Sequence, residues 1–129
     1  MKREIKFRAW SANSEKMMDW DFIKSVGNLN KLLSLNHVVV QQYTGYKDKN
    51  GVEIYEGDIL QVAPMSDYPG FTSVVLFAAG SFRVTEADYN EMDNIDNSPT
   101  TLEDANVNKD IVIGNIYQSP ELHNNPPLD

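Results

Sequence analysis

Two chain reversals lie close together in the centre of the sequence, and they limit the folds open to it. The first is the dipeptide Asn50-Gly51, which two β-type runs flank. Asn-Gly is the pair that best takes the two positive φ angles of a type I′ turn, so it predicts a β-hairpin. The second is the run YEGD at 55–58, in which Gly57 is free to take a left-handed conformation. Reversals this near to each other predict a strongly bent sheet.

Strand-like patterns occur on both sides of this centre. Residues 5–10 alternate between apolar side chains and basic or aromatic ones, which predicts a half-buried strand with a basic outer face. Residues 16–20 are predicted to return beside it, so that 4–21 form a hairpin in which Trp10 faces Trp20. Further β-type runs lie at 38–43, 59–62, 72–77, 82–85 and 111–113, with turns or bulges at Gly80-Ser81 and Gly114-Asn115.

Helical spacing appears in one stretch. The apolar residues between 21 and 35 recur on one helical face, and they predict a short helix near 28–35 that covers the core. His37 follows it without a neighbouring carboxylate or second imidazole, so we interpret it as structural. Ser119 before Pro120 is typical of a helix start. The chain is thus predicted to be mainly β with short helices, its hairpins forming a small, partly open SH3-like barrel or a strongly bent sheet.

The negative charge belongs to the second half of the chain. Up to Ala63 there are 9 basic and 8 acidic residues, whereas from Pro64 onward there are 2 basic and 11 acidic ones. We interpret 86–110 as an acidic surface segment, which would repel nucleic-acid phosphates and favour solubility or a basic partner surface. Within it, 93–97 lacks the glycine and distal glutamate of a calcium-binding loop. The proline-containing tail at 123–129 is expected to fray.

Composition sets the broad class. A chain of 129 residues with 41% hydrophobic and 23% charged residues is expected to form a single soluble domain over 1–129. It has no cysteine, which excludes disulfides, a thiolate nucleophile and a cysteine-based zinc site. We find no signal peptide and no apolar run of membrane-spanning length, and we therefore expect a cytoplasmic protein without membrane contact.

Catalytic patterns are lacking at the level of sequence. There is no GxSxG elbow and no HExxH motif, and the chain has 2 histidines. The one enzymatic alternative is carboxylate chemistry: Glu56 and Asp58 could perform acid–base work or hold magnesium if they converged across a cleft. The other reading is that Asp58 accepts hydrogen bonds from turn amides while Glu56 is solvated. We expect no catalysis, no cofactor and no metal site.

Three sequence blocks carry a resemblance to a known family. These blocks are REIKFRAW at the start, QYTGYKDKNGVEIYEGDIL in the centre and VIGNIYQSPEL near the end. Together they resemble the YopX family, small proteins of phages and prophages of Gram-positive bacteria for which no activity is established. The resemblance spans the chain and implies its fold and origin rather than a mechanism. Its expected structural motif comprises Tyr43, Gly45, Asn50, Gly51, Tyr55, Gly57, Asp58, Gly114 and Asn115.

These observations lead to three functional hypotheses. The first is a non-enzymatic accessory protein that binds a host or phage protein or assembles with itself, through an acidic face or an oligomeric surface such as an exposed edge strand. Glu56 and Asp58 are possible binding residues. The second is nucleic-acid binding through the basic first strand, by Lys2, Arg3, Lys6, Arg8 and a stacking Trp10. The third is an acidic inhibitor whose carboxylates imitate DNA phosphates. We take protein binding as the leading hypothesis.

Overall fold

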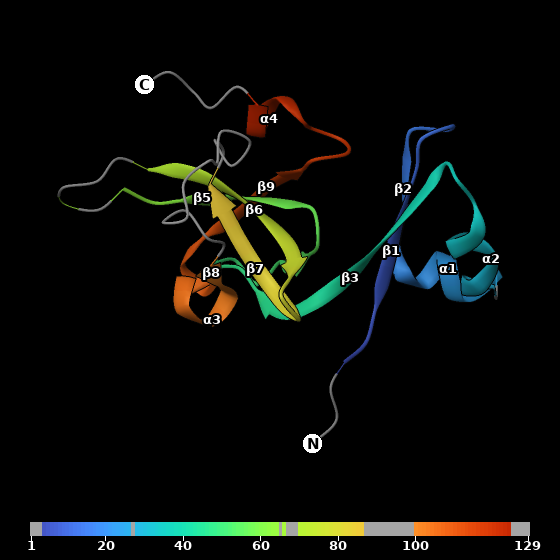
Figure 1. Ribbon diagram of the computed structural model, residues 1–129, viewed down its shortest axis with the longest axis horizontal. Coiled ribbons are helices and arrows are strands. Elements are labelled where there is room, and N and C mark those ends of the chain that lie inside the picture. The colour runs from blue at the N-terminus through green and yellow to red at the C-terminus, as the bar shows by residue number, and fades with distance from the viewer. Residues whose placement is uncertain (1–3, 27, 65, 67–69, 87–99, 125–129) are drawn as a thin grey trace.

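The computed structural model describes residues 4–26, 28–64, 66, 70–86 and 100–124, and it is mainly β with short helices (Figure 1). The strands are β1 (Phe7–Ser11), β2 (Lys16–Met18), β3 (Val38–Lys47), β4 (Glu53–Tyr55), β5 (Asp58–Val62), β6 (Phe71–Ala78), β7 (Ser81–Glu86), β8 (Thr100–Thr101) and β9 (Ile111–Asn115). The helices are α1 (Trp20–Val26), α2 (Leu29–Ser34), α3 (Leu102–Ala105), a 3-10 turn (Val107–Lys109) and α4 (Glu121–Asn124). This content confirms the predicted fold class.

The first sheet is antiparallel, with strand order β2-β1-β3-β4, and α1 and α2 lie beside it. The predicted N-terminal hairpin is present, but its second strand ends at Met18 because Asp19 begins a helix. The Asp19 carboxylate accepts a hydrogen bond from the Phe22 backbone N–H at 2.8 Å, as an N-cap does. Trp20 therefore lies in α1 and packs edge-on against Phe7, so the predicted Trp10–Trp20 pair is wrong.

Strand β3 runs through both halves of the molecule (Figure 1). Its first half, Val38 to Gln42, pairs with β1, and its second half pairs with β4. The register shifts between Tyr43 and Lys47, where Gly45 has φ +90°. A positive φ at an irregular strand position is the role that glycine fills most readily. The expected structural use of Gly45 is thus a bend in the strand that joins the two sheets.

The second sheet has the order β8-β7-β6-β5-β9 and curls into a half-barrel. Its hydrophobic core also takes residues from β4, α3 and the 3-10 turn. The register of β9 against β5 shifts at Gly114, so the predicted bulge is present there. The buried cluster consists of Ile54, Leu60, Val75, Val84, Leu102 and Val107.

The segment predicted as an acidic surface, 86–110, is partly core. Residues 87–99 lie outside the described residues. In the remainder, Leu102 is 2% exposed, Val107 is 0% exposed and Asp110 is 5% exposed. Their short helical turns cover the open face of the second sheet because the apolar side chains at 102 and 107 both reach its core. The surface interpretation is wrong for these residues.

The two central reversals differ in how well they were predicted. At Asn50-Gly51, Gly51 has φ +83° whereas Asn50 is not among the residues with positive φ, so the turn is not type I′. The loop is instead held by Asp48, whose Oδ1 accepts the backbone N–H groups of Asn50 and Val52 at 2.8 Å. At the second reversal, Gly57 has φ +85°, as predicted.

Elsewhere, the β6–β7 hairpin and the C-terminal helix follow the predicted pattern. Ala79 and Gly80 both have positive φ between the paired residues Ala78 and Ser81, which fits a type I′ turn. Helix α4 extends to Asn124, so the first two residues of the predicted frayed tail are helical, and 125–129 lie outside the described residues. Within the described part of the chain, every helix is too short or too polar to span a bilayer.

Candidate functional site

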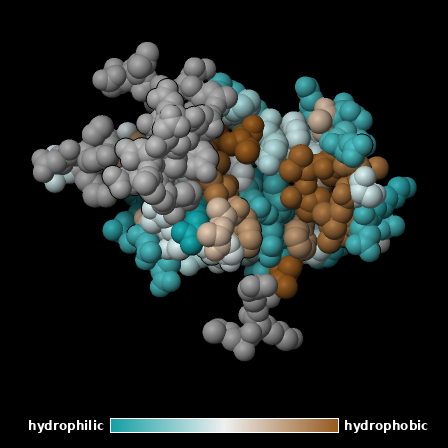
Figure 2. Space-filling model, viewed as in Figure 1, coloured by the Kyte–Doolittle hydropathy of each residue, from teal (hydrophilic) through white to brown (hydrophobic). Residues whose placement is uncertain are grey.

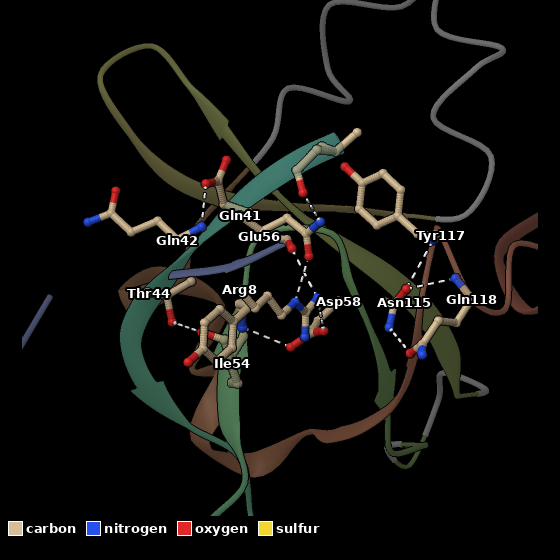
Figure 3. Close-up of polar contacts among 12 residues, drawn as sticks. Arg8, Gln41, Gln42, Thr44, Ile54, Glu56, Asp58, Asn115, Tyr117 and Gln118 are labelled. Atoms are coloured by element: carbon tan, nitrogen blue, oxygen red, sulfur yellow. Dashed lines mark hydrogen bonds and ion pairs between the residues drawn. The ribbon is translucent and has the colours of Figure 1, made fainter. Parts of the chain in front are cut away.

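A buried ion pair joins the two sheets (Figure 3). Arg8 on β1 donates from Nη2 to Oδ1 of Asp58 on β5 at 2.7 Å, and the exposed fractions of the two side chains are 14% and 1%. The other carboxylate oxygen of Asp58 accepts the Tyr55 backbone N–H at 2.8 Å. Burial raises the pKa of Asp58, and the charge of Arg8 opposes that rise. The pair is therefore well placed to fix the sheets against each other.

The rest of the Arg8 guanidinium is also occupied. Its Nε donates to the side-chain oxygen of Gln41 at 2.6 Å, and Nη2 lies 3.2 Å from the backbone oxygen of Glu56. The guanidinium carbon stands 4.8 Å from the centre of the Tyr55 ring, a cation–π distance. Arg8 was predicted on a basic outer face, yet these contacts turn it inward.

Glu56 and Asp58 do not converge. Asp58 turns toward Arg8, whereas the Glu56 carboxylate accepts the Gln42 backbone N–H at 2.8 Å. The backbone of Glu56 also donates to the Gln42 oxygen at 3.0 Å. Both carboxylates serve the turn and the strand beside it, so the geometry gives no support to the predicted shared magnesium or acid–base site.

Lys6, the next predicted binding residue, is held by acidic neighbours. Its Nζ forms ion pairs with Glu53 and Glu4, and hydrogen bonds to these carboxylates raise its pKa. It also lies 5.3 Å from the centre of the Tyr43 ring. The surrounding pocket, about 400 Å³ in volume, includes Asp19 and Asp21. Trp10, half-buried on β1, is opposite Met17 in the β1–β2 register and is not part of this pocket.

An apolar groove lies beside the ion pair, where β3 approaches β6 and the segment after β9. It has a volume of about 450 Å³. Its lining includes Val39 and Val40 of β3, Phe77 of β6 and Tyr117, which follows β9. Val39 and Phe77 are 40% and 56% exposed, which is high for large apolar side chains. Polar atoms reach the groove from Gln41, Glu56 and Thr85.

Gly57 forms part of the groove floor and is held tightly. Its backbone N–H donates to Val75 at 2.8 Å, and its oxygen accepts from Ile116 at 2.9 Å. A Cβ added to Gly57 would lie 2.8 Å from the Tyr117 ring. Position 57 therefore requires glycine for two reasons: its backbone has a positive φ, and the Tyr117 ring lies where a Cβ would be. Burial raises the pKa of Tyr117, with the Glu56 charge adding to the effect.

Asn115 and Asp48 complete the polar framework. Asn115 was predicted as a motif residue, and its Oδ1 accepts the backbone N–H groups of Tyr117 and Gln118 in the turn that positions the Tyr117 ring. Asp48 was missed by sequence reasoning. In addition to its loop contacts, its Oδ2 accepts the Val112 N–H at 2.9 Å. Burial alone would raise the pKa of Asp48, but these backbone N–H donors lower it. An aspartate two residues before Asn50 was the local signal for the loop contacts.

The fold is shared with solved proteins. The structure is similar to that of protein EF1440 from Enterococcus faecalis, with a TM-score of 0.60 and 24% sequence identity over 95% of this chain and 99% of that chain. It is also similar to protein yopX from Bacillus subtilis, with a TM-score of 0.59 and 22% identity over 91% and 96% of the two chains. At these identities the likeness shows the fold alone.

Comparison with curated proteins gives no match. The family described as YopX protein matches residues 24–124, which include the central turns, the bulge at Gly114, strands β3 and β4 of the first sheet and the strands of the second sheet. The central and closing sequence blocks lie within this match and the opening block lies before it; the resemblance to the family is confirmed, and the chain belongs to the YopX family.

Proposed function

We propose that this protein is a non-enzymatic accessory protein of a phage or prophage that acts by binding another protein through the apolar groove. The observation that carries the proposal is that this groove is bordered by a strand edge with no neighbouring strand in the described part of the chain. The first half of β3 pairs with β1 on one side, but β4 begins to pair with it only at Tyr43. The groove lies along the edge that is left.

In an antiparallel strand, the backbone N–H and C=O groups of successive residues point to opposite edges, and this alternation identifies the β3 residue whose groups face the groove. The Tyr43 N–H bonds to Lys6 on the β1 side, so the backbone groups of Gln42 and Val40 point to the opposite edge. The Gln42 N–H and C=O are both hydrogen-bonded to Glu56. Val40 lines the groove and leaves an N–H and a C=O facing it. An extended peptide could add there as a further strand, with main-chain hydrogen bonds for affinity.

The walls of the groove suit apolar side chains from such a peptide. Its volume of about 450 Å³ lies within the usual range of roughly 300–1,000 Å³ for binding pockets. Val39 and Phe77 can bury surface against a partner because they are exposed in the free chain. Tyr117 adds a large ring, and aromatic residues are enriched at protein interfaces.

The charged residues support protein binding over nucleic-acid binding. Arg8 is paired with Asp58, and Lys6 is paired with Glu53 beside further carboxylates. Phosphate contact would need these cations to be released, and nearby carboxylates would repel the phosphate. The DNA-mimic hypothesis rests largely on 87–99, which lie outside the described residues, and the partly buried remainder gives it no support.

The test is capture of a partner by groove variants. Purified protein is immobilised and exposed to nuclease-treated lysate of a Gram-positive host, and retained proteins are quantified by mass spectrometry. Val40→Pro removes the N–H that faces the groove, and Phe77→Asp places a charge in its wall. We expect both variants to lose the dominant partner, and the binding to be reproduced with that partner purified.

Leu33→Ser is the matched control. Leu33 is 60% exposed on α2 and is not among the residues that line the groove, while Figure 2 shows other hydrophobic residues gathered around α1 and β1. We expect this variant to retain the partner. Equal capture by all variants, or retention of nucleic acid alone, would refute the proposal. If the wild type is a dimer in sedimentation and Phe77→Asp is a monomer, the occupant of the groove is a second copy of this chain.

A further inference from the structure

A third, smaller pocket opens on the second sheet, with a volume of about 240 Å³. Strands β5 to β8 contribute to its wall, together with α3 and the residue that follows the 3-10 turn. That residue is Asp110. The backbone of Asp110 is fully used, because its N–H donates to Val107 at 3.0 Å and its C=O accepts from Lys49 at 2.9 Å. These bonds hold the carboxylate at the pocket.

The Asp110 side chain, unlike its backbone, has no hydrogen-bond or ion-pair partner among the described residues. Asp110 is nevertheless buried, with 5% of its surface exposed. A buried carboxylate normally has a partner, since the loss of water is unfavourable for a charge. Asp110 is therefore the charged side chain that a ligand in this pocket would meet.

Ser73 supplies an independent second observation. Ser73 is one of the residues that line the same pocket, and its hydroxyl oxygen is buried without a hydrogen-bond partner among the described residues. Ser73 is 3% exposed, so bulk water does not satisfy it. Buried hydroxyls without a partner are rare and need an explanation. Two unsatisfied polar groups in one pocket indicate a ligand that can donate hydrogen bonds to both.

The other residues that line the pocket indicate which further chemical group the ligand carries. Val62, Phe71, Val84 and Ala105 present apolar surface. A divalent metal ion does not suit this environment, because Mg²⁺ and Ca²⁺ require several oxygen ligands and one carboxylate is present. A compact cation on a short hydrocarbon stem suits it better, since the stem fits the apolar walls and the cation faces the carboxylate.

We propose that this pocket binds an alkylammonium group, with its nitrogen donating hydrogen bonds to the Asp110 carboxylate and the Ser73 hydroxyl. An ammonium has three N–H donors and no acceptor, which matches a site that offers oxygen acceptors. The group can belong to a free small amine or to a lysine side chain of a protein partner. The two sources share this chemistry, and the experiment below separates them.

The acid–base properties of Asp110 agree with this geometry. Burial raises its pKa to about 6, and the charge of Lys109 opposes the rise. Among the described residues, Lys109 is the charged group that acts on Asp110, and the described residues that line the pocket include no second charged side chain. Ligand affinity should therefore fall as the pH is lowered through about 6, because protonation removes the charge that the ammonium faces.

The probe is n-butylammonium chloride, titrated into the full chain at pH 7.5 and 150 mM salt and followed by amide NMR. We expect saturable shifts centred on the amides of Ser73 and Asp110. Asp110→Asn keeps the shape of the side chain and the backbone bonds, and should weaken binding by about tenfold or more. Ser73→Ala should weaken it by about threefold. Neutral n-butanol should bind more weakly than the ammonium.

Asp104→Asn is the charge-matched control, because Asp104 is an exposed carboxylate on neighbouring α3. It should bind the probe as the wild type does. A folded Asp110→Asn variant with undiminished affinity, or no saturable binding by the wild type, overturns the proposal. A lysine derivative blocked at its α-amino and carboxyl groups separates the sources. Equal binding of that derivative indicates a protein lysine, and preference for n-butylammonium indicates a free amine; either result supports the site.

Discussion

Asp58 and Asp110 are both buried aspartates, and burial raises the pKa of each, yet their surroundings are opposite. Asp58 lies between the two sheets and is bound by Arg8 and a backbone N–H. Asp110 lies at the edge of a pocket without a partner for its carboxylate in the described part of the chain. The difference separates a carboxylate that stabilises the fold from one that is available to a ligand.

The largest expected effect comes from breaking the paired site. Arg8→Ala leaves the Asp58 charge buried without its cation, and removal of one partner of a buried pair costs about 3–5 kcal/mol. Unfolding in urea, followed by circular dichroism, measures the loss. Lys24→Ala is the control, because Lys24 forms an exposed ion pair with Asp21 and should change the unfolding free energy by less than about 1 kcal/mol. A similar loss in both variants would contradict the structural role of Arg8.

The second effect sharpens the comparison through pH. Asp110 has a pKa of about 6 when folded and 3.8 as its ordinary value, so the folded chain binds the proton more strongly. Stability should therefore fall as the pH rises from about 4 to about 6. Asp110→Asn should remove this contribution. Urea unfolding of both proteins at pH 4 and pH 7 gives the difference, and an identical pH dependence in the two would refute it.

The third effect concerns the turn that leads into Asp58. Gly57→Ala must adopt a positive φ and also displace the Tyr117 ring, and we expect it to cost about 2–3 kcal/mol. Gly51→Ala is matched, since Gly51 has a similar φ but no atom within 4 Å of an added Cβ. It should cost about 1 kcal/mol. The difference in stability between the two variants, measured by thermal unfolding, gives the effect of the contact with the Tyr117 ring. Equal losses of stability would show that this contact contributes nothing.

The smallest effect tests the unpartnered site again. Because the Ser73 hydroxyl has no partner in the described part of the structure, Ser73→Ala should change stability by less than about 0.5 kcal/mol or increase it. Thr44→Val provides the contrast, since its hydroxyl donates to the Ile54 oxygen at 2.7 Å. That variant should lose about 1 kcal/mol. Denaturant unfolding compares them, and a clear loss in Ser73→Ala would indicate a hydrogen bond to its hydroxyl.

Local signals predicted the local parts of this fold. The turn at Gly57, the β6–β7 hairpin and the helix capped by Asn28 all depend on residues a few positions apart. The failure at Asn50-Gly51 is also local, because Asp48 gives the chain hydrogen bonds that a type I′ turn lacks. Likewise, Asp19 ended the first hairpin early by capping a helix.

The contacts that define the candidate site are distant in sequence, and this explains why they were missed. Arg8 and Asp58 are 50 residues apart, and Asp48 and Val112 are 64 apart. Alternation placed Arg8 on an outer face, but it cannot reveal that a second sheet covers that face. Asp110 follows a run of acidic and polar residues, so composition indicated a solvated carboxylate. Only the packing of Val107 into the core shows that it is enclosed.

The course of β3 has a consequence for how the molecule unfolds. One strand of ten residues supplies hydrogen bonds to β1 in one sheet and to β4, whose Ile54 enters the core of the other. Neither half can lose its structure without removing pairing from a strand that the other half uses. The two sheets should therefore unfold in a single cooperative transition, and the β3 amide hydrogens that are bonded to β1 or β4 should exchange at the rate of global opening.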